Sequence, residues 1–299
     1  MSQPRESVWW ERVLFAAWLV FAITGWAQTT VLQPGILLTV TKGAGPTELS
    51  SSDIDLKEDG RTPHTVSVVK WRNLPLRVGI VIDESGSGRR AGLHSVIIQR
   101  TLDSAADWLQ AHGGDGFLVG FNDQIIISTE LVTDVGHFRN VMGQLRPIGG
   151  SAIRDAVVHA GQKFFSVAPE SKPSIRVILL VSDGYDNASN ASEQRALETA
   201  QREGVRVYAI SFPSPEAAAG RRLLENIARH TGGHAFFPVT DTELATALKA
   251  IDDELSNSFL VSFASETRDG KFHSLKIRVR GVDDQGLRFM PAFASSVKP

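Results

Sequence analysis

Residues 78–88, with the sequence VGIVIDESGSG, join an apolar run to a loop rich in oxygen-bearing side chains. The run from 78 to 82 is almost all β-branched, which is typical of a parallel strand covered by helices on both faces. Such strands carry functional residues at their carboxyl ends, and Asp83 lies at that end. On a tight loop the hydroxyls of Ser85 and Ser87 can turn toward its carboxylate. These donors suit a hard divalent cation of the magnesium type, although the same residues would also form an ordinary loop that caps the next helix.

Two later segments favour the metal site over the capping loop. Residues 176–184, RVILLVSDG, form a second apolar run that ends in an acid, Asp183. Between the two runs, Gly149 and Gly150 make a turn that places Ser151 where a helix should begin. Because functional loops gather at the carboxyl edge of a parallel sheet, we expect these three loops to converge on one point.

This order of motifs, Asp-x-Ser-x-Ser, then Gly-Gly-Ser, then Ser-Asp-Gly, resembles the metal-ion-dependent adhesion site (MIDAS) of the von Willebrand factor type A (VWA) domain family. In that family the metal shell comes from the Asp and two Ser of the first motif, a Thr of the second and the Asp of the third. The resemblance therefore implies a metal shell of Asp83, Ser85, Ser87, Ser151 and Asp183. Ser151 stands where the family usually has Thr. Since the hydroxyl is retained, we expect the difference to alter affinity and side-chain stiffness rather than to abolish binding.

The resemblance also implies a function in binding rather than in catalysis. We expect Mg²⁺, or Mn²⁺ or Ca²⁺, with one coordination position open for an Asp or Glu carboxylate of a partner protein. The alternative is a metal-dependent hydrolase outside the cytoplasm that uses the same ion to activate water. A His or Glu general base in the three loops would favour that alternative, and none is evident from the sequence.

Composition excludes several other classes of protein. The net charge of −2 and the pI of about 6.5 provide no basic surface for nucleic acid. The absence of cysteine excludes disulfides and thiolate metal sites.

Two other candidate motifs are disfavoured. A dinucleotide site at Gly86, Gly88 and Gly92 is disfavoured because Asp83 would repel the pyrophosphate. His230 and His234 are four residues apart, but two glycines between them break the helix that a zinc pair would need.

The N-terminus has the layout of a signal peptide. Arg5 and Arg12 precede an apolar stretch at residues 13–23, and small residues before position 28 predict cleavage after Ala27. The stretch is about half of the roughly 20 residues that a membrane span requires, so an uncleaved anchor is the weaker interpretation. The sequence therefore predicts a secreted or periplasmic protein with no integral span after cleavage.

From residue 76 the sequence alternates between strand and helix patterns. This alternation predicts an α/β fold with a doubly wound, mostly parallel sheet and one hairpin, within a VWA domain at residues 73–256. We expect its helices at residues 91–112, 151–167, 190–203, 220–230 and 241–255. Asp155 is expected to hydrogen-bond the loops of the site, whereas Glu84 and Asp186 are expected to be solvated.

The two ends of the chain, residues 28–72 and 257–299, carry short strand patterns. Neither end is long enough to bury a core alone, so we expect their roughly six strands to form one small antiparallel module around the inserted domain. In residues 274–280, Leu275, Ile277 and Val279 alternate with polar residues and need a covering face, which the 36–40 strand can provide. The flanking motifs at residues 56–60 and 269–275 also resemble those of VWA-related proteins of acidobacteria.

Overall fold

The computed structural model describes part of the 299-residue chain, namely residues 35–41, 48–63, 66–88, 93–143, 145–166, 173–267 and 269–295. The expected signal segment at residues 1–27 lies outside these ranges. Within them, no helix is both long enough and apolar enough to cross a membrane.

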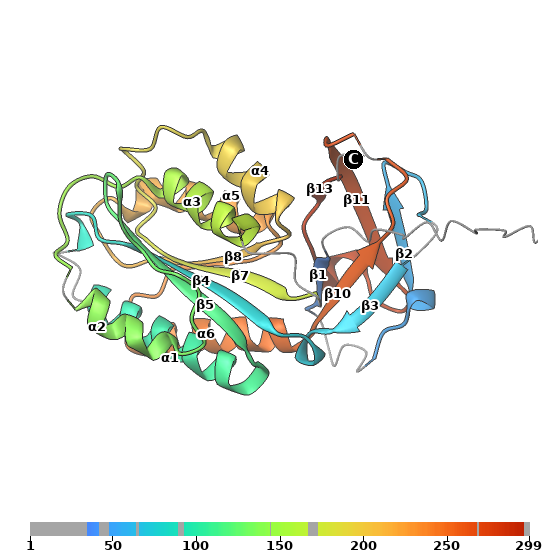
Figure 1. Cartoon of the computed structure of the whole chain (residues 1–299), viewed down its shortest axis with the longest axis horizontal. Coiled ribbons are helices and arrows are strands. Elements are labelled where there is room, and N and C mark those ends of the chain that lie inside the picture. The colour runs from blue at the N-terminus through green and yellow to red at the C-terminus, as the bar shows by residue number, and fades with distance from the viewer. Residues whose placement is uncertain are drawn as a thin grey trace, which may run out of the picture. The chain divides into compact units, whose positions relative to one another are not determined.

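A six-stranded sheet with the order β6-β5-β4-β7-β8-β9 forms the centre of the VWA region (Figure 1). All neighbouring strands pair in parallel except β5 and β6, which form the expected antiparallel hairpin. The strands are β4 (Leu76–Asp83), β5 (Gly114–Phe121), β6 (Ile125–Ser128), β7 (Ile175–Val181), β8 (Arg206–Ile210) and β9 (Ala235–Phe236). The predicted α/β, mostly parallel fold is thus confirmed.

Helices cover both faces of this sheet, with α1, α2 and α6 on one side and α3, α4 and α5 on the other (Figure 1). Neighbouring β4 residues alternate between the two cores, since Ile80 packs on the α1 side and Val81 on the α3 side. The helices are α1 (His94–His112), α2 (Phe138–Met142), α3 (Ile153–Ser166), α4 (Glu193–Arg202), α5 (Ala217–His230) and α6 (Asp241–Ser256). The short α2 helix is not among the predicted elements.

The terminal segments pair with one another in two antiparallel sheets, β12-β1-β10-β3 and β13-β11-β2. In the first sheet the C-terminal strand β10 lies between the N-terminal strands β1 and β3, which confirms that both ends of the chain build one module. The strands are β1 (Ile36–Val40), β2 (Ile54–Glu58), β3 (Val66–Lys70), β10 (Ser258–Phe263), β11 (Phe272–Val279), β12 (Leu287–Arg288) and β13 (Ala292–Ala294).

The two sheets enclose a shared apolar core. Ile36 and Leu38 of β1 belong to the same buried cluster as Leu275, Ile277 and Val279 of β11. The period-two alternation along β11 therefore does identify the face that is covered. Val40 is buried as well but lies outside this cluster.

Strand β1 also joins the module to the VWA region. Its Leu37 points the other way and packs into the core formed by α1, α6 and the central sheet. The buried Arg206 of β8 donates hydrogen bonds to the Thr39 hydroxyl and the Leu37 carbonyl. A buried guanidinium needs such partners, so β1 is fixed to the VWA region by polar as well as apolar contacts.

We therefore expect a chain shortened to residues 28–256 to lose stability or aggregate relative to residues 28–299. Removal of β10 leaves the edges of β1 and β3 unpaired, and removal of β11 exposes Ile36 and Leu38. Size-exclusion chromatography and thermal melts would measure this. Equal monodispersity and melting temperature for residues 28–256, 72–256 and 28–299 would contradict a shared module.

The two flanking motifs singled out in the sequence meet at His273. Its Nδ1 lies 2.8 Å from Asp59 Oδ2 and its Nε2 lies 3.0 Å from Asp269 Oδ1, while Glu58 Oε1 is 3.9 Å from Nδ1. Burial alone would lower the pKa of His273, but the hydrogen bonds to Asp59 and Asp269 outweigh it and raise the pKa above the ordinary value. The protonated form of the ring can donate to both carboxylates and so links the turn after β2 to β11.

The contacts of His273 with Asp59 and Asp269 predict a contribution to stability that depends on pH. A base whose pKa is raised on folding stabilises the protein fully below its unfolded pKa, and the contribution is lost as the pH rises through the folded pKa. The melting temperature should therefore fall on His273→Asn by more at about pH 5.5 than at about pH 9. A difference that stays constant between these pH values would show that the charge of His273 is not involved.

Candidate metal centre

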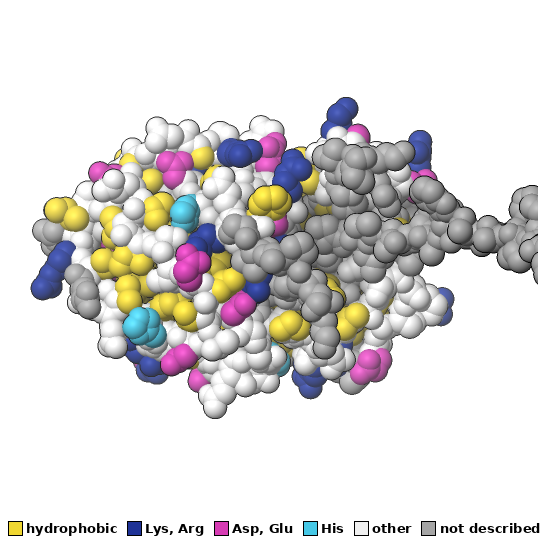
Figure 2. All heavy atoms as spheres, in the orientation of Figure 1, with side chains coloured by type: hydrophobic (Ala, Val, Ile, Leu, Met, Phe, Trp, Pro, Cys, Tyr) yellow, Lys and Arg dark blue, Asp and Glu magenta, His cyan; other side chains and the backbone are white. Residues whose placement is uncertain are grey.

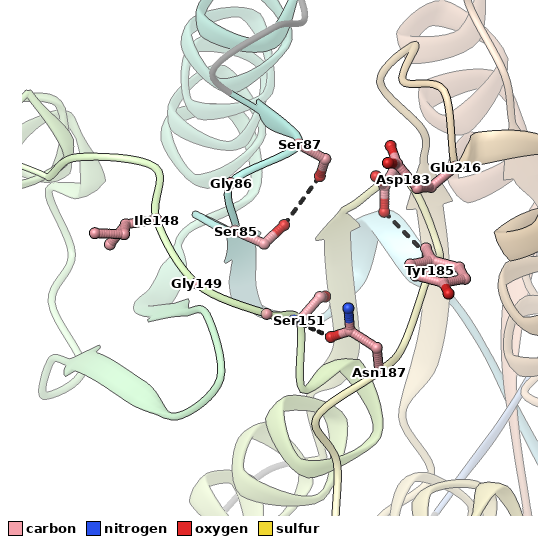
Figure 3. A pocket seen from close by; sticks show the side chains of 11 residues that line it. Ser85, Gly86, Ser87, Ile148, Gly149, Ser151, Asp183, Tyr185, Asn187 and Glu216 are labelled. Carbon is pink, nitrogen blue, oxygen red and sulfur yellow. Dashed lines mark hydrogen bonds between the residues drawn. The ribbon is translucent and has the colours of Figure 1, made fainter.

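Three loops meet at the carboxyl edge of the central sheet and surround a pocket of about 410 Å³ (Figure 3). Backbone hydrogen bonds join them, because Gly86 N donates to Gly149 O at 3.0 Å and Asn187 N donates to Ser151 O at 3.0 Å. The lining residues are Ser85, Gly86, Ser87, Ile148, Gly149, Gly150, Ser151, Asp183, Tyr185, Asn187 and Glu216. The structure thus brings together four of the five residues implied by the MIDAS resemblance, and the fifth, Asp83, lies directly behind them.

Asp83 is fully buried and is held by donors from three loops. Its Oδ2 accepts hydrogen bonds from the hydroxyls of Ser151 and Ser182, each at 2.7 Å, and its Oδ1 accepts one from Ser85 N at 2.9 Å. Because the Ser151 hydroxyl donates its proton to Asp83, its oxygen lone pairs remain available to a cation in the pocket. Asp83 thereby orients a donor that lines the pocket.

Burial raises the pKa of two adjacent acids. For Asp83 it raises the pKa to about 6, although hydrogen bonds from Ser182, Ser85 and Ser151 act in the opposite direction. For Glu84, burial and then the nearby charge of Asp83 raise the pKa to about 7. Glu84 is only 3% exposed, so the expectation that it is solvated was wrong. A divalent cation nearby would stabilise the charged form of both acids.

The glycine pair before Ser151 allows the loops to approach closely. Gly149 has a φ of +82°, which disfavours side chains with a Cβ. A Cβ on Gly150 would lie 2.7 Å from Asn187 Oδ1, the atom that accepts a hydrogen bond from Ser151 N at 2.8 Å. Both glycines are therefore required by the packing that positions Ser151.

Asp183 lines the opposite side of the pocket (Figure 3). Its Oδ1 accepts a hydrogen bond from Tyr185 N at 3.0 Å, and its Oδ2 accepts one from the Ser214 hydroxyl at 2.7 Å. Across the pocket, the hydroxyls of Ser85 and Ser87 are 3.0 Å apart. The carboxylate and these hydroxyls are the hard oxygen donors that Mg²⁺ and similar ions prefer.

Sequence reasoning missed several residues that support these donors. Ser182 could have been found from its place beside Asp183 in the quoted motif, but Ser214 and Asn187 carry no comparable signal. His94 was also missed, and its Nε2 donates to the Asp83 carbonyl at 3.0 Å. Burial lowers the pKa of His94, which favours the neutral form of the ring.

A second layer of contacts holds the loop that follows β7. Asp155 accepts hydrogen bonds from Asn190 N and Ala191 N at 2.9 and 2.7 Å, as expected for a residue that supports the loops. Asp186 was expected to be solvated, and this was wrong. Its side chain is 4% exposed and pairs with Arg154 at 3.0 Å, which lowers its pKa against the effect of burial.

Comparison with known proteins identifies the family. The von Willebrand factor type A domain model matches residues 78–253. The chain belongs to this family. None of the curated proteins compared matches it significantly.

Several solved structures are similar to this chain. A von Willebrand factor type A protein from Catenulispora acidiphila is 14% identical with a TM-score of 0.51, and the match covers 82% of this chain and 73% of that one. An aerotolerance-related membrane protein from Bacteroides fragilis is 17% identical with a TM-score of 0.48, covering 60% and 98%. The manganese-loaded TRAP protein of Plasmodium vivax is 15% identical with a TM-score of 0.47, covering 82% and 100%.

The residues present fit a hard divalent cation. Within the described ranges, no three His, Cys, Asp or Glu residues group as metal ligands. The pocket offers the hydroxyls of Ser85, Ser87 and Ser151 beside the Asp183 carboxylate. His230 and His234 do not form a pair, since His230 Nδ1 bonds Asn226 O at 2.9 Å and His234 Nδ1 lies 2.7 Å from Arg288 Nη1.

Replacing Ser151 by Thr should retain cation binding and strengthen it by a small factor. The added methyl group restricts the hydroxyl without removing the oxygen or its hydrogen bond to Asp83. Isothermal titration calorimetry with Mn²⁺ would measure the change in affinity. Ser151→Ala is the matched control, because it removes the hydroxyl oxygen that Ser151→Thr keeps. Complete loss of affinity in a folded Ser151→Thr protein would mean that Ser151 is outside the shell or that its pocket has no room.

Proposed function

We propose that this protein is an extracytoplasmic binding module whose VWA domain, residues 73–256, holds Mg²⁺, or Mn²⁺ or Ca²⁺. The observation that carries the proposal is the convergence of three hydroxyls and Asp183 on one pocket, above a buried carboxylate that accepts a hydrogen bond from one of these hydroxyls, that of Ser151. Ser85, Ser87, Ser151 and Asp183 would contact the ion. Asp83 would act from behind, through hydrogen bonds or through a bound water.

The partner would supply a carboxylate. The shell contains few charged donors, so a bound ion would keep much of its positive charge and attract an Asp or Glu side chain of another protein. Because the pocket lies in a partly buried position between loops, this attraction would be less screened than on an open surface. Specificity for an acidic residue follows from the charge of the site.

The rim of the pocket favours a protein over a small anion as the partner. Ile148 and Tyr185 line the pocket and are 58% and 42% exposed. Apolar and aromatic side chains around a polar centre are common in protein interfaces, where they exclude water from the central contact. On the face seen in Figure 2, charges of both signs are scattered among the described residues, which gives no support to nucleic-acid binding.

The location outside the cytoplasm rests on the signal-like sequence of residues 1–27. The hydrolase alternative needs a general base at the pocket. None of the lining residues is a histidine, but Glu216, which lies outside the three motif loops, lines the pocket and is the residue that a hydrolase could use as a base. We favour binding because Ile148 and Tyr185 at the rim of the pocket suit a protein partner.

Calorimetry with Mg²⁺ and Mn²⁺ tests the site. Asp183→Ala should weaken binding strongly, and Asp83→Ala should abolish it because the Ser151 and Ser182 hydroxyls lose their acceptor. The buried hydroxyls left unpaired by Asp83→Ala should also lower stability by about 1–3 kcal/mol each. A matched control is Asp253→Ala, at an exposed position on α6 whose side chain pairs with Lys249.

Wild-type affinity in a folded Asp83→Ala, Asp183→Ala double variant would refute the assignment. If the ion binds as expected, capture of a partner from an envelope extract should require both the ion and Asp183. Capture that persists in the presence of a chelator would instead place the binding surface elsewhere.

A further inference from the structure

Glu216 lines the pocket although it belongs to none of the three recognised motifs. It lies between β8 and α5, and Figure 3 labels it at the pocket together with Asp183. Its Oε2 atom is buried and has no hydrogen-bond partner among the described residues. A buried carboxylate oxygen without a donor is costly, because desolvation is not compensated.

The local structure does not explain this carboxylate. Glu216 is the N-cap residue of α5, yet its side chain forms no capping hydrogen bond. Its backbone N donates to the Ser214 hydroxyl at 3.2 Å, and that hydroxyl donates to Asp183 at 2.7 Å. The loop between β8 and α5 therefore brings Glu216 to the pocket that Asp183 also lines, and both carboxylates would attract a cation there.

We propose that Glu216 is an internal carboxylate ligand of the cation. It would reach the ion from the α5 side and occupy the coordination position that the five MIDAS residues leave open. A partner's carboxylate would then bind by displacing Glu216. This inference rests on the proposed cation site, and it adds that the protein without its partner is held in a self-liganded state.

This arrangement has two consequences for the partner-free protein. Glu216 should increase the affinity for the cation, because a second carboxylate would join Asp183 in contact with the ion. It should also reduce access for other carboxylates, since an internal ligand is present at a high effective concentration. The partner must therefore bind strongly enough, through the ion and the rim, to replace it.

Mn²⁺ alone is a suitable probe, with Glu216→Gln and Glu216→Ala as variants. Calorimetry should show at least about a tenfold loss of Mn²⁺ affinity in Glu216→Ala, as is typical when groups around a metal are removed. Water-proton relaxation should show about one more fast-exchanging water on bound Mn²⁺, because the position becomes open to solvent. Glu216→Gln should change both quantities in the same direction.

Glu225→Gln is the matched control. Glu225 lies on α5, away from the residues that line the pocket, and its side chain pairs with the exposed Arg221. Its Mn²⁺ affinity and hydration should equal those of the wild type. The metal-free Glu216 variants should melt no lower than the wild type, because the lost carboxylate oxygen has no donor.

Two failures can be told apart. If the wild-type protein binds no Mn²⁺, the proposed cation site itself is wrong. If the wild type binds Mn²⁺ but either the affinity or the hydration of the ion is unchanged in the folded Glu216→Ala variant, Glu216 is not a ligand and only this inference is overturned.

Discussion

A single buried carboxylate organises the site. Asp83 accepts a backbone hydrogen bond from its own loop, one hydroxyl from the loop before α3 and another from the loop after β7. A buried anion is tolerated only when its oxygens are paired, so the three loops must close on Asp83 in one arrangement. The position of the Ser151 hydroxyl, which lines the pocket, follows from this requirement.

The central sheet places Asp83 where this is possible. Strand β4 lies between β5 and β7, and the pairing of Ile82 with Val181 puts Asp83 next to Ser182 at the carboxyl edge. Helices on both faces exclude water from the strand, which accounts for the complete burial of Asp83. The apolar strand β4 thus both positions Asp83 and contributes to its burial.

Features encoded in short stretches of sequence could be predicted, and so could the pairing of the two chain ends, because neither end can bury a core alone. Individual contacts between distant side chains could not. The strand ending at Asp83 and the glycine turn before Ser151 are local patterns. The pairing of Asp186 with Arg154 joins different elements, and the sequence pattern around Asp186 does not reveal it. The helix predicted to begin at Gly220 begins at Ala217 in the structure. A Cβ on Gly220 would lie 2.2 Å from Gly184 C, so this glycine permits the close approach of α5 to the loop after β7.

The pairing of β1 with β10 also constrains the order in which the chain can fold. Thr39 pairs with Ser258, 219 positions further along, so β1 has no strand on that side until the whole VWA region has been synthesised. Contacts between such distant residues form slowly, because a long loop must close first. During synthesis at about 5–20 residues per second, the apolar strand β1 therefore waits for more than about ten seconds with an open edge. The inserted arrangement of the domain therefore leaves an apolar strand edge open to aggregation while the rest of the chain is being made.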